Sequence, residues 1–158
     1  MTTAAGTAEP QLSDAELAAW RGLLRAHSSL VKLLDAELEQ SHGVALSSFE
    51  VLARLEQADG GRMRMCELAE SVLLSRSGLT RLVDRLERDG LVVRGSCEHD
   101  ARGSFAVITQ AGGDVLAAAG STHLAAVRRH FVGCFSAAEL ETLSGFWQRL
   151  VADGALIS

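Results

Sequence analysis

The spacing of apolar residues changes once along this chain, near residue 90, and that change limits the folds it can adopt. Before it, apolar residues spaced i, i+3, i+4 and i+7 predict an amphipathic helix over about residues 76–89. These residues are Leu79, Leu82, Val83 and Leu86. After it come two short segments rich in β-branched residues, 91–94 and 105–108, separated by a polar stretch that contains glycines. This order predicts a helix followed directly by a β-hairpin with a long tip over residues 95–104.

Serine and glycine residues indicate where the other helices begin and end. The pattern S-x-x-E, in which serine and glutamate satisfy free amides at a helix start, occurs at Ser13, Ser47 and Ser136. Glycines at 43, 60–61, 90, 133 and 154 are expected at helix ends. With the apolar spacing, these signals predict helices over about 14–40, 48–58, 65–72, 76–89, 110–131 and 137–152.

A tight turn over residues 73–75 joins helix 65–72 to helix 76–89, and the hairpin follows at once. This succession is a winged helix-turn-helix. In that motif the second helix enters the major groove of DNA with its N-terminal residues against the base edges. The predicted fold class is therefore mainly α with a β-hairpin wing, flanked by N- and C-terminal helices.

The side of helix 76–89 that lies opposite its leucines carries groups suited to DNA. Ser77, Thr80 and Arg81 offer the small donors and acceptors and the guanidinium fork that read base edges. Three further arginines are better placed for phosphates, which fix register without conveying sequence. They are Arg76, Arg85 and Arg88. The alternative is a solvated helix face with an Asp84–Arg88 ion pair at i,i+4.

The hairpin tip favours the DNA interpretation. Arg102 stands beside Gly103 in a projecting loop, from which a guanidinium could enter the narrow, negative minor groove. Asp100 could orient a neighbouring arginine and limit the disorder of its side chain. The alternative is a polar tip without a ligand. Such a loop directly after a helix-turn-helix points to the first interpretation.

The charge balance excludes a basic surface over the whole chain, because the net charge is −5 and the pI about 5.5. The charge is unevenly distributed. Residues 62–102 hold eight arginines and seven acids, which is +1, and this leaves −6 for the rest. Any arginine-bearing surface is therefore local.

Three motifs resemble the MarR (multiple antibiotic resistance regulator) family: LTRLVDRLERDGLVVR over 79–94, DAR over 100–102 and VITQAG over 107–112. With the flanking helices the resemblance covers residues 13–152. It implies a homodimeric transcription factor on a palindromic operator, often released by a small ligand held between the dimer and DNA-binding parts. It also implies groove contacts by Ser75, Arg76, Ser77, Thr80 and Arg81 and a wing contact by Arg102. Ile108 stands where the family usually has Leu, a volume-conserving change.

Large apolar residues outside the winged part also indicate a homodimer, since exposed patches of that size usually mark an interface. They are Trp20, Phe131, Phe135, Phe146 and Trp147. We expect a flexible tail over 1–12, a dimerisation helix over 13–44, the winged DNA-binding domain over 45–109 and C-terminal dimerisation helices over 110–158. A two-fold dimer would hold its recognition helices roughly 34–36 Å apart, one turn of double-stranded DNA.

Histidines are the candidate sensor residues. His27 lies on the apolar face of the first helix, as a core or interface histidine or, with Trp20 and Ser28, in a pocket for a small-molecule effector. His42 near the end of that helix suits the helix dipole. A zinc site could combine histidines with a cysteine or carboxylate, but no pair has tight ligand spacing, so neither a metal nor a cofactor is predicted.

The three cysteines are an odd number without metal-site spacing and do not indicate a disulfide framework. Cys66 at a helix start and Cys97 in the wing are candidate redox sensors, whereas Cys134 is expected to be buried. A redox- or zinc-responsive regulator of the same fold therefore remains an alternative.

Other functional classes find no support in the sequence. It has no Gly-rich phosphate loop, nucleophile elbow or helix with paired metal histidines, so no enzyme is expected. Neither a membrane span nor a secretory signal is evident, and a cytoplasmic location is expected. The alternative from a different class is a protein-interaction module that keeps the fold without binding DNA.

Overall fold

The computed structural model describes the backbone of residues 11–72, 74–97 and 100–152, and their side chains apart from those of 96–103 and 151–152. Its helices are α1 (Asp14–His42), α2 (Leu46–Gln57), α3 (Met65–Ser71), α4 (Arg76–Arg88), α5 (Gln110–His130) and α6 (Ala137–Ala152). Its strands are β1 (Arg62–Arg64), β2 (Val92–Cys97) and β3 (Asp100–Ile108), and 3-10 turns span Asp59–Gly61 and Val132–Cys134. The predicted fold class is confirmed: the chain is mainly helical with a small antiparallel sheet.

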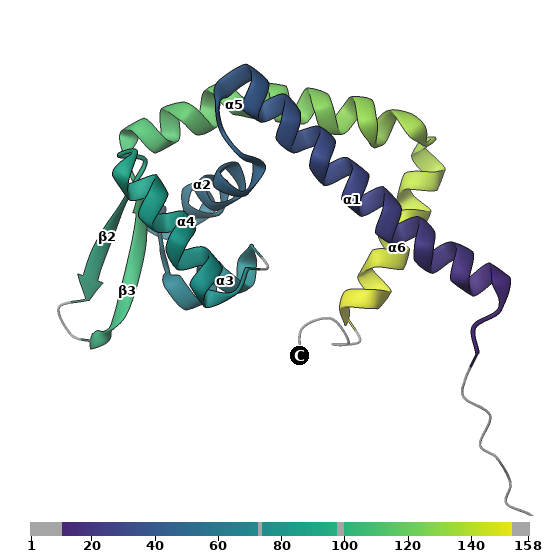
Figure 1. Cartoon of the computed structure of the whole chain (residues 1–158), viewed down its shortest axis with the longest axis horizontal. Coiled ribbons are helices and arrows are strands. Elements are labelled where there is room, and N and C mark those ends of the chain that lie inside the picture. The colour runs from purple at the N-terminus through teal and green to yellow at the C-terminus, as the bar shows by residue number, and fades with distance from the viewer. Residues whose placement is uncertain (1–10, 73, 98–99, 153–158) are drawn as a thin grey trace, which may run out of the picture.

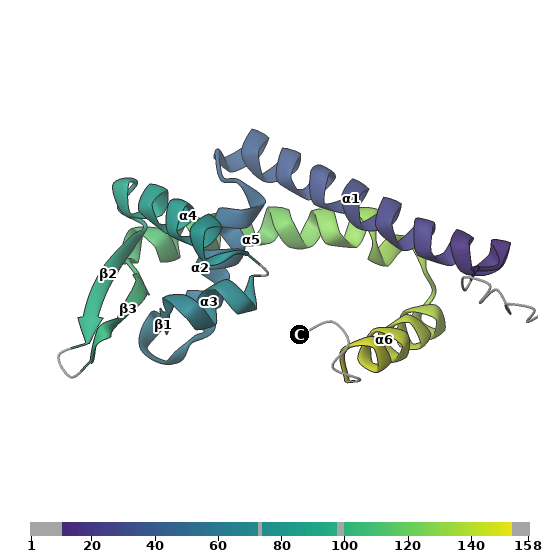
Figure 2. The same cartoon turned by 60° about the horizontal axis from the view of Figure 1, so that its bottom comes forward.

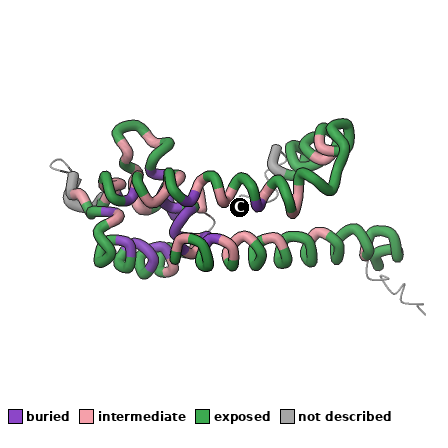
Figure 3. Tube along the Cα trace, turned by 90° about the horizontal axis from the view of Figure 1, so that it is seen from above, coloured by how far each residue is buried: buried purple, intermediate pink, exposed green. Residues whose placement is uncertain are grey.

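Two regions are distinct in Figure 1. Residues 46–108, from α2 to β3, form the winged part, and α1, α5 and α6 form a helical arm that extends away from it. Most buried positions lie at the winged end of the molecule, while the far end of the arm is largely exposed (Figure 3). The fully buried leucines and valines of the winged part come from α2, α3, α4 and β2 and form one core: Val51, Leu52, Leu55, Leu68, Leu79, Val83, Leu86 and Val92.

Local capping accounts for most helix starts, but not for that of α2. Ser13 and Ser136 form the predicted capping boxes. The predicted box at Ser47 is wrong, because α2 begins at Leu46, two residues earlier than predicted, and its N-cap residue, Ala45, makes no side-chain hydrogen bond. The Leu46 amide instead donates to Asp35 Oδ1 at 2.7 Å. A carboxylate of α1 therefore caps α2, which ties the arm to the winged part.

The sheet differs from the predicted hairpin in two ways. Its order is β1-β3-β2, and the short edge strand β1, which pairs Arg64 with Phe105, was not predicted. The predicted long tip over 95–104 is wrong, because β2 continues to Cys97 and β3 begins at Asp100, with a register irregularity after Ser96. The wing is thus a paired ribbon that projects from the helices (Figure 2).

A glycine lets α5 start against the winged part. Thr109 caps α5 and accepts a hydrogen bond from the amide of Gly112 at 3.1 Å. A Cβ on Gly112 would lie only 2.2 Å from the Leu91 carbonyl oxygen. The absence of a side chain therefore allows the first turn of α5 to rest on the chain that enters β2.

The arm is held together by polar contacts between α1 and α5, which run side by side in Figures 1 and 2. Glu37 on α1 accepts a hydrogen bond from Arg129 at 3.0 Å and pairs with His130 Nε2 at 2.5 Å. His42 Nε2 and Thr122 Oγ1 share a hydrogen bond at 2.7 Å. His42 thus joins the two helices in addition to lying at the end of α1.

The arm exposes large apolar side chains, as the sequence predicts. Trp20, Phe135, Phe146 and Trp147 are exposed in the protomer, whereas Phe131 is half-buried. Cys134 is also exposed, so the expectation that it is buried is wrong. Among the described helices, none has the length and apolar character that crossing a bilayer requires.

Candidate nucleic-acid interface

The candidate interface is built on α4, whose start is fixed by Ser75. The Ser75 hydroxyl oxygen accepts a hydrogen bond from the Gly78 amide at 3.1 Å, which is N-cap geometry. The predicted apolar stripe of α4 faces the core, with Leu79 and Leu86 each 1% exposed. This burial fixes the rotation of the helix about its axis, so the opposite side must face solvent.

The residues predicted to read bases lie on that outward side. Ser77, Thr80 and Arg81 are all exposed. Thr80 Oγ1 donates to the Arg76 carbonyl at 2.8 Å, so its lone pairs and methyl group are what it presents outward. Arg81 Nε donates to the Ser77 carbonyl at 3.4 Å. That contact orients the side chain along α4 and leaves the terminal nitrogens for a ligand.

The three arginines predicted to bind phosphate are also exposed. Arg85 Nη2 donates to Ser48 Oγ of α2, and Arg88 Nε donates to the Asp84 carbonyl, each at 3.4 Å. Neither contact neutralises the guanidinium, because hydroxyl and carbonyl oxygens carry no net charge. Both arginines can therefore still pair with an anion.

An ion-pair cluster links the wing to α4, and sequence reasoning missed it. Arg94 on β2 pairs with Asp84, donates to the Thr80 carbonyl, and lies 3.6 Å from Glu87. The Asp84 carboxylate therefore pairs with Arg94 and not with Arg88, which was the alternative considered from the sequence. Arg94 and Asp84 balance each other and hold the wing against the recognition helix. The signal was the motif itself, in which an acid on α4 precedes the arginine by ten residues.

For two residues of the wing that the sequence predicts to be functional, the structure describes the backbone alone. Asp100 and Arg102 lie at the start of β3, and their side chains fall outside those described. Their predicted roles, minor-groove contact for Arg102 and orientation of an arginine for Asp100, stay predictions.

A groove of about 1030 Å³ lies between the arm and the winged part. It brings His27 of α1 together with Phe49 of α2 and His123 of α5. The other two residues predicted for a pocket, Trp20 and Ser28, are exposed on α1 and are not among the described residues that line this groove.

His123 is the most constrained polar residue of the groove. Its ring lies against Phe49 with the centroids 4.6 Å apart, and its buried Nδ1 has no hydrogen-bond partner among the described residues. Burial lowers the pKa of His123, and the nearby Glu50 carboxylate opposes that shift only in part. The wall of the groove thus contains a histidine whose buried Nδ1 has no partner among the described residues.

The alternative sensor sites gain no geometric support. Within the described ranges, no three histidine, cysteine or acidic side chains come together as metal ligands. Cys66 and Cys134 are exposed and form no disulfide, and the Cys97 side chain lies outside those described, so the redox alternative stays a prediction.

A buried helix-turn-helix, an exposed face of polar and arginine side chains, and an adjoining β-ribbon define a winged helix-turn-helix protein.

A MarR family model matches residues 42–103. Three structures of Streptomyces coelicolor MarR family transcriptional regulators are similar to the whole chain. AbsC is 33% identical over 94% of this chain and 99% of its own, with a TM-score of 0.85. Sco3205, crystallised with DNA, is 33% identical over 92% of this chain and 94% of its own, with a TM-score of 0.85. Sco5413 is 27% identical over 91% of this chain and 99% of its own, with a TM-score of 0.78.

The chain therefore belongs to the MarR family. It is a transcriptional regulator that binds DNA, and the family is not one of enzymes. This membership decides against the alternative of an interaction module that has lost DNA binding.

Proposed function

We propose that this protein is a homodimeric repressor that occupies a pseudo-palindromic operator and leaves it when a small ligand binds. The observation that carries the proposal is the outward side of α4, where Ser77, Thr80 and Arg81 are exposed while the leucines behind them are buried. A similar protein, Sco3205, was crystallised with DNA. A dimer bound to such a site in a promoter prevents RNA polymerase from binding there. The gene is then repressed.

The homodimer is supported by the apolar side chains of α1 and α6, which the protomer leaves exposed. A two-fold axis through the arm repeats the winged part on the other side, so that each recognition helix meets one half-site. We assign dimerisation to residues 13–44 and 110–158 and DNA binding to residues 45–109. Half-sites are then expected about one helical turn apart.

The groove between the arm and the winged part is the proposed effector site. A ligand releases the operator only if it binds two dimer geometries unequally. This requirement favours the groove, because its walls come from both regions: His27 and His123 from the arm, Phe49 from the winged part. We retain Trp20 and Ser28 as candidate contacts on the same helix as His27.

The test begins with a duplex selected from random DNA and titrated at fixed salt. Arg81→Ala and Arg102→Ala are each expected to weaken binding by roughly 5- to 150-fold, which corresponds to about 1–3 kcal/mol. Arg54→Ala is the matched control, because Arg54 is exposed on α2, where it lines the groove between the arm and the winged part and not the outward side of α4. Undiminished specific binding by both test variants would show that the contact surface is assigned wrongly.

Ligand release needs its own measurement. A library of small compounds is screened for release of the selected duplex, and each active compound is retested on His123→Phe. Loss of release in this variant, with DNA affinity unchanged, supports the groove as the effector site. Release that is equal in both proteins places the effector elsewhere.

A further inference from the structure

The groove between the arm and the winged part is acidic as well as apolar. Large apolar side chains from α1, α2 and α5 line it, among them Val31, Phe49 and Leu116. Three carboxylates and one guanidinium also line it: Asp35, Glu50, Glu56 and Arg54. With the histidines neutral, the described lining therefore carries an excess of two negative charges. A ligand that combines an apolar body with a positive charge is complementary to both features.

Neighbouring basic groups do not neutralise these carboxylates. Within the described residues none of the three forms an ion pair, and Glu50 forms none with Arg54 one turn further along α2. Asp35 accepts the hydrogen bond of the Leu46 amide, but an amide has no net charge, so the negative charge of Asp35 is retained. Burial lowers the pKa of His123 below its ordinary 6.5, and this histidine therefore adds little positive charge at neutral pH.

Two of the carboxylates belong to the same part of the groove. Asp35 Oδ1 lies 2.7 Å from the amide of Leu46, the first residue of α2. Glu50 is four residues further along α2, which places it on the same side of the helix as Leu46. The neighbour of Glu50 in the sequence is Phe49, whose ring also lines the groove. An apolar wall and two negative charges thus lie within reach of one small molecule.

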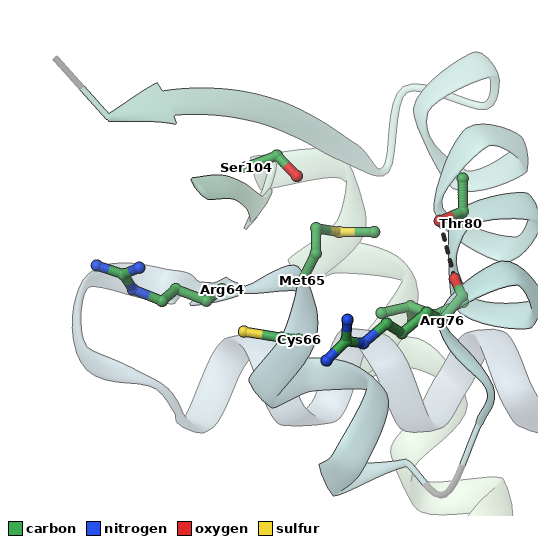
Figure 4. A pocket seen from close by; sticks show the side chains of 7 residues that line it. Arg64, Met65, Cys66, Arg76, Thr80 and Ser104 are labelled. Carbon is green, nitrogen blue, oxygen red and sulfur yellow. Dashed lines mark hydrogen bonds between the residues drawn. The ribbon is translucent and has the colours of Figure 1, made fainter. Parts of the chain in front are cut away.

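The acidic lining is particular to this groove and does not follow from the net charge of −5 alone. A separate hollow, of about 420 Å³, lies between α4 and the sheet (Figure 4). Arg64 and Arg76 line it, and none of its described lining residues is acidic. The two recesses of the same acidic protein therefore differ in the sign of their charge.

The size of the groove and its ligating groups narrow the kind of cation. Its volume of about 1030 Å³ suits a small organic molecule, and sites for such molecules are lined mainly by apolar side chains with a few polar groups. A bare metal ion is not favoured, because no three ligand side chains come together in the described ranges. An organic amine with an apolar ring or chain meets both conditions.

We propose that this groove binds an organic cation, with the apolar body of the ligand against Phe49 and Leu116 and its ammonium group beside Asp35 and Glu50. The inference rests on the proposed effector site and deepens it by naming the chemical class of the ligand. The apolar contacts provide affinity for any ring of this size. The two carboxylates provide the preference for a positive charge.

The test is direct binding to the full chain without DNA, measured by calorimetry with three probes that share one ring system. They are 1-naphthylmethylammonium, 1-naphthylmethanol and 1-naphthoate. The cation is expected to bind at least about tenfold more tightly than the neutral alcohol, because each carboxylate attracts it at short range, and the anion is expected to bind most weakly.

The combined variant Asp35→Asn with Glu50→Gln removes both charges and retains the size of the side chains and an oxygen that caps α2. It is expected to bind the cation roughly tenfold more weakly and the alcohol as the wild type does. The matched control is Glu39→Gln with Glu70→Gln, since both are exposed and neither is among the described residues that line the groove. It is expected to bind all three probes as the wild type does.

A third variant locates the ligand. Gly120 lines the groove, and nothing lies within 4 Å of a Cβ at this position, so Gly120→Leu places a side chain in the groove and is expected to weaken binding of cation and alcohol alike. The proposal is overturned by any of four results: no binding of the cation at millimolar concentration, an anion that binds as tightly, a charge-removing variant that keeps the preference for the cation, or a folded Gly120→Leu that binds the cation undiminished. Failure of the proposed function looks different, because the cation then binds as described and leaves the selected duplex bound.

Discussion

The winged part and the helical arm use their apolar residues in opposite ways. In α4, which has 13 residues, four are buried, whereas α1 has 29 residues and only Leu38 is buried. None of the described side chains of α6 is buried. Yet both regions carry apolar residues at helical spacing. The difference is that the apolar residues of the winged part are buried within the same protomer, whereas most of those on α1 and α6 are not.

That difference indicates which region is complete within one chain. The winged part has its own core and needs no second copy to bury it. The arm keeps Trp20 54%, Phe146 48% and Trp147 40% exposed, a state that costs solvation free energy unless another surface covers them. A second copy of the chain offers the same surface in return, so the comparison supports the proposed homodimer.

The largest expected effect comes from charging the arm. Trp147→Asp with Leu150→Asp places two carboxylates on the exposed stripe of α6. We expect monomers in sedimentation, and affinity for a two-half-site duplex lower by on the order of 10²–10⁴, because each winged part must then bind alone. Val93→Asp, at a similarly exposed apolar position of β2, is the control and is expected to sediment as wild type. If the double variant still sedimented as a dimer, the exposed stripe of α6 would not be the surface that a second copy covers.

Core truncation tests the other side of the comparison. In the charged, monomeric background, Leu52→Ala is expected to lower the free energy of unfolding by about 2–5 kcal/mol, because Leu52 is fully buried in the winged core. Leu24→Ala, on the half-exposed face of α1, is expected to change it by about 0.5 kcal/mol or less. Denaturant titration measures both. Equal losses would mean that the arm also has a core of its own.

Local signals in the sequence predicted the helices and the α4 face well. The spacing of Leu79, Leu82, Val83 and Leu86 extends over two turns of the helix, so the buried side and the solvent-facing side both follow from it. Caps at Ser13 and Ser136 are formed by residues close in sequence, and they too were predicted.

Features that depend on distant contacts were missed. The strand β1 has three residues, two of them arginines, and it exists because β3 pairs with it. The start of α2 is set by Asp35, eleven residues away, rather than by the nearby Ser47.

Two neighbouring glycines test how the arm joins the winged part. Gly112→Ala is expected to cost about 1–3 kcal/mol, because its Cβ would meet the Leu91 carbonyl at 2.2 Å and Ile108 at 2.9 Å. At Gly113, one residue on, nothing lies within 4 Å of a Cβ, and the same change is expected to stabilise the protein by up to about 1 kcal/mol through helix propensity. Thermal unfolding shows the sign of each. If Gly112→Ala stabilised the protein, the first turn of α5 would not be packed closely against Leu91.

The smallest expected effect concerns the polar contacts that hold the arm straight. The hydrogen bond from His130 lowers the pKa of Glu37 below its ordinary 4.5, Arg129 adds to this, and burial opposes it. A carboxyl whose pKa is lower in the folded state stabilises that state above the unfolded pKa and loses this contribution as the pH falls through the folded one.

The contact is therefore expected to stabilise the arm near neutral pH and to fade progressively below 4.5. Glu37→Gln removes the titrating group and retains the shape of the side chain. Its unfolding midpoint should lie below that of the wild type at about pH 7 and approach it at about pH 3, as measured by circular dichroism. Because the pair joins α1 to α5 within one protomer, this difference should also persist in the charged monomeric variant. Equal midpoints of the two proteins at about pH 7 would show that shape, rather than charge, couples the two helices at this position.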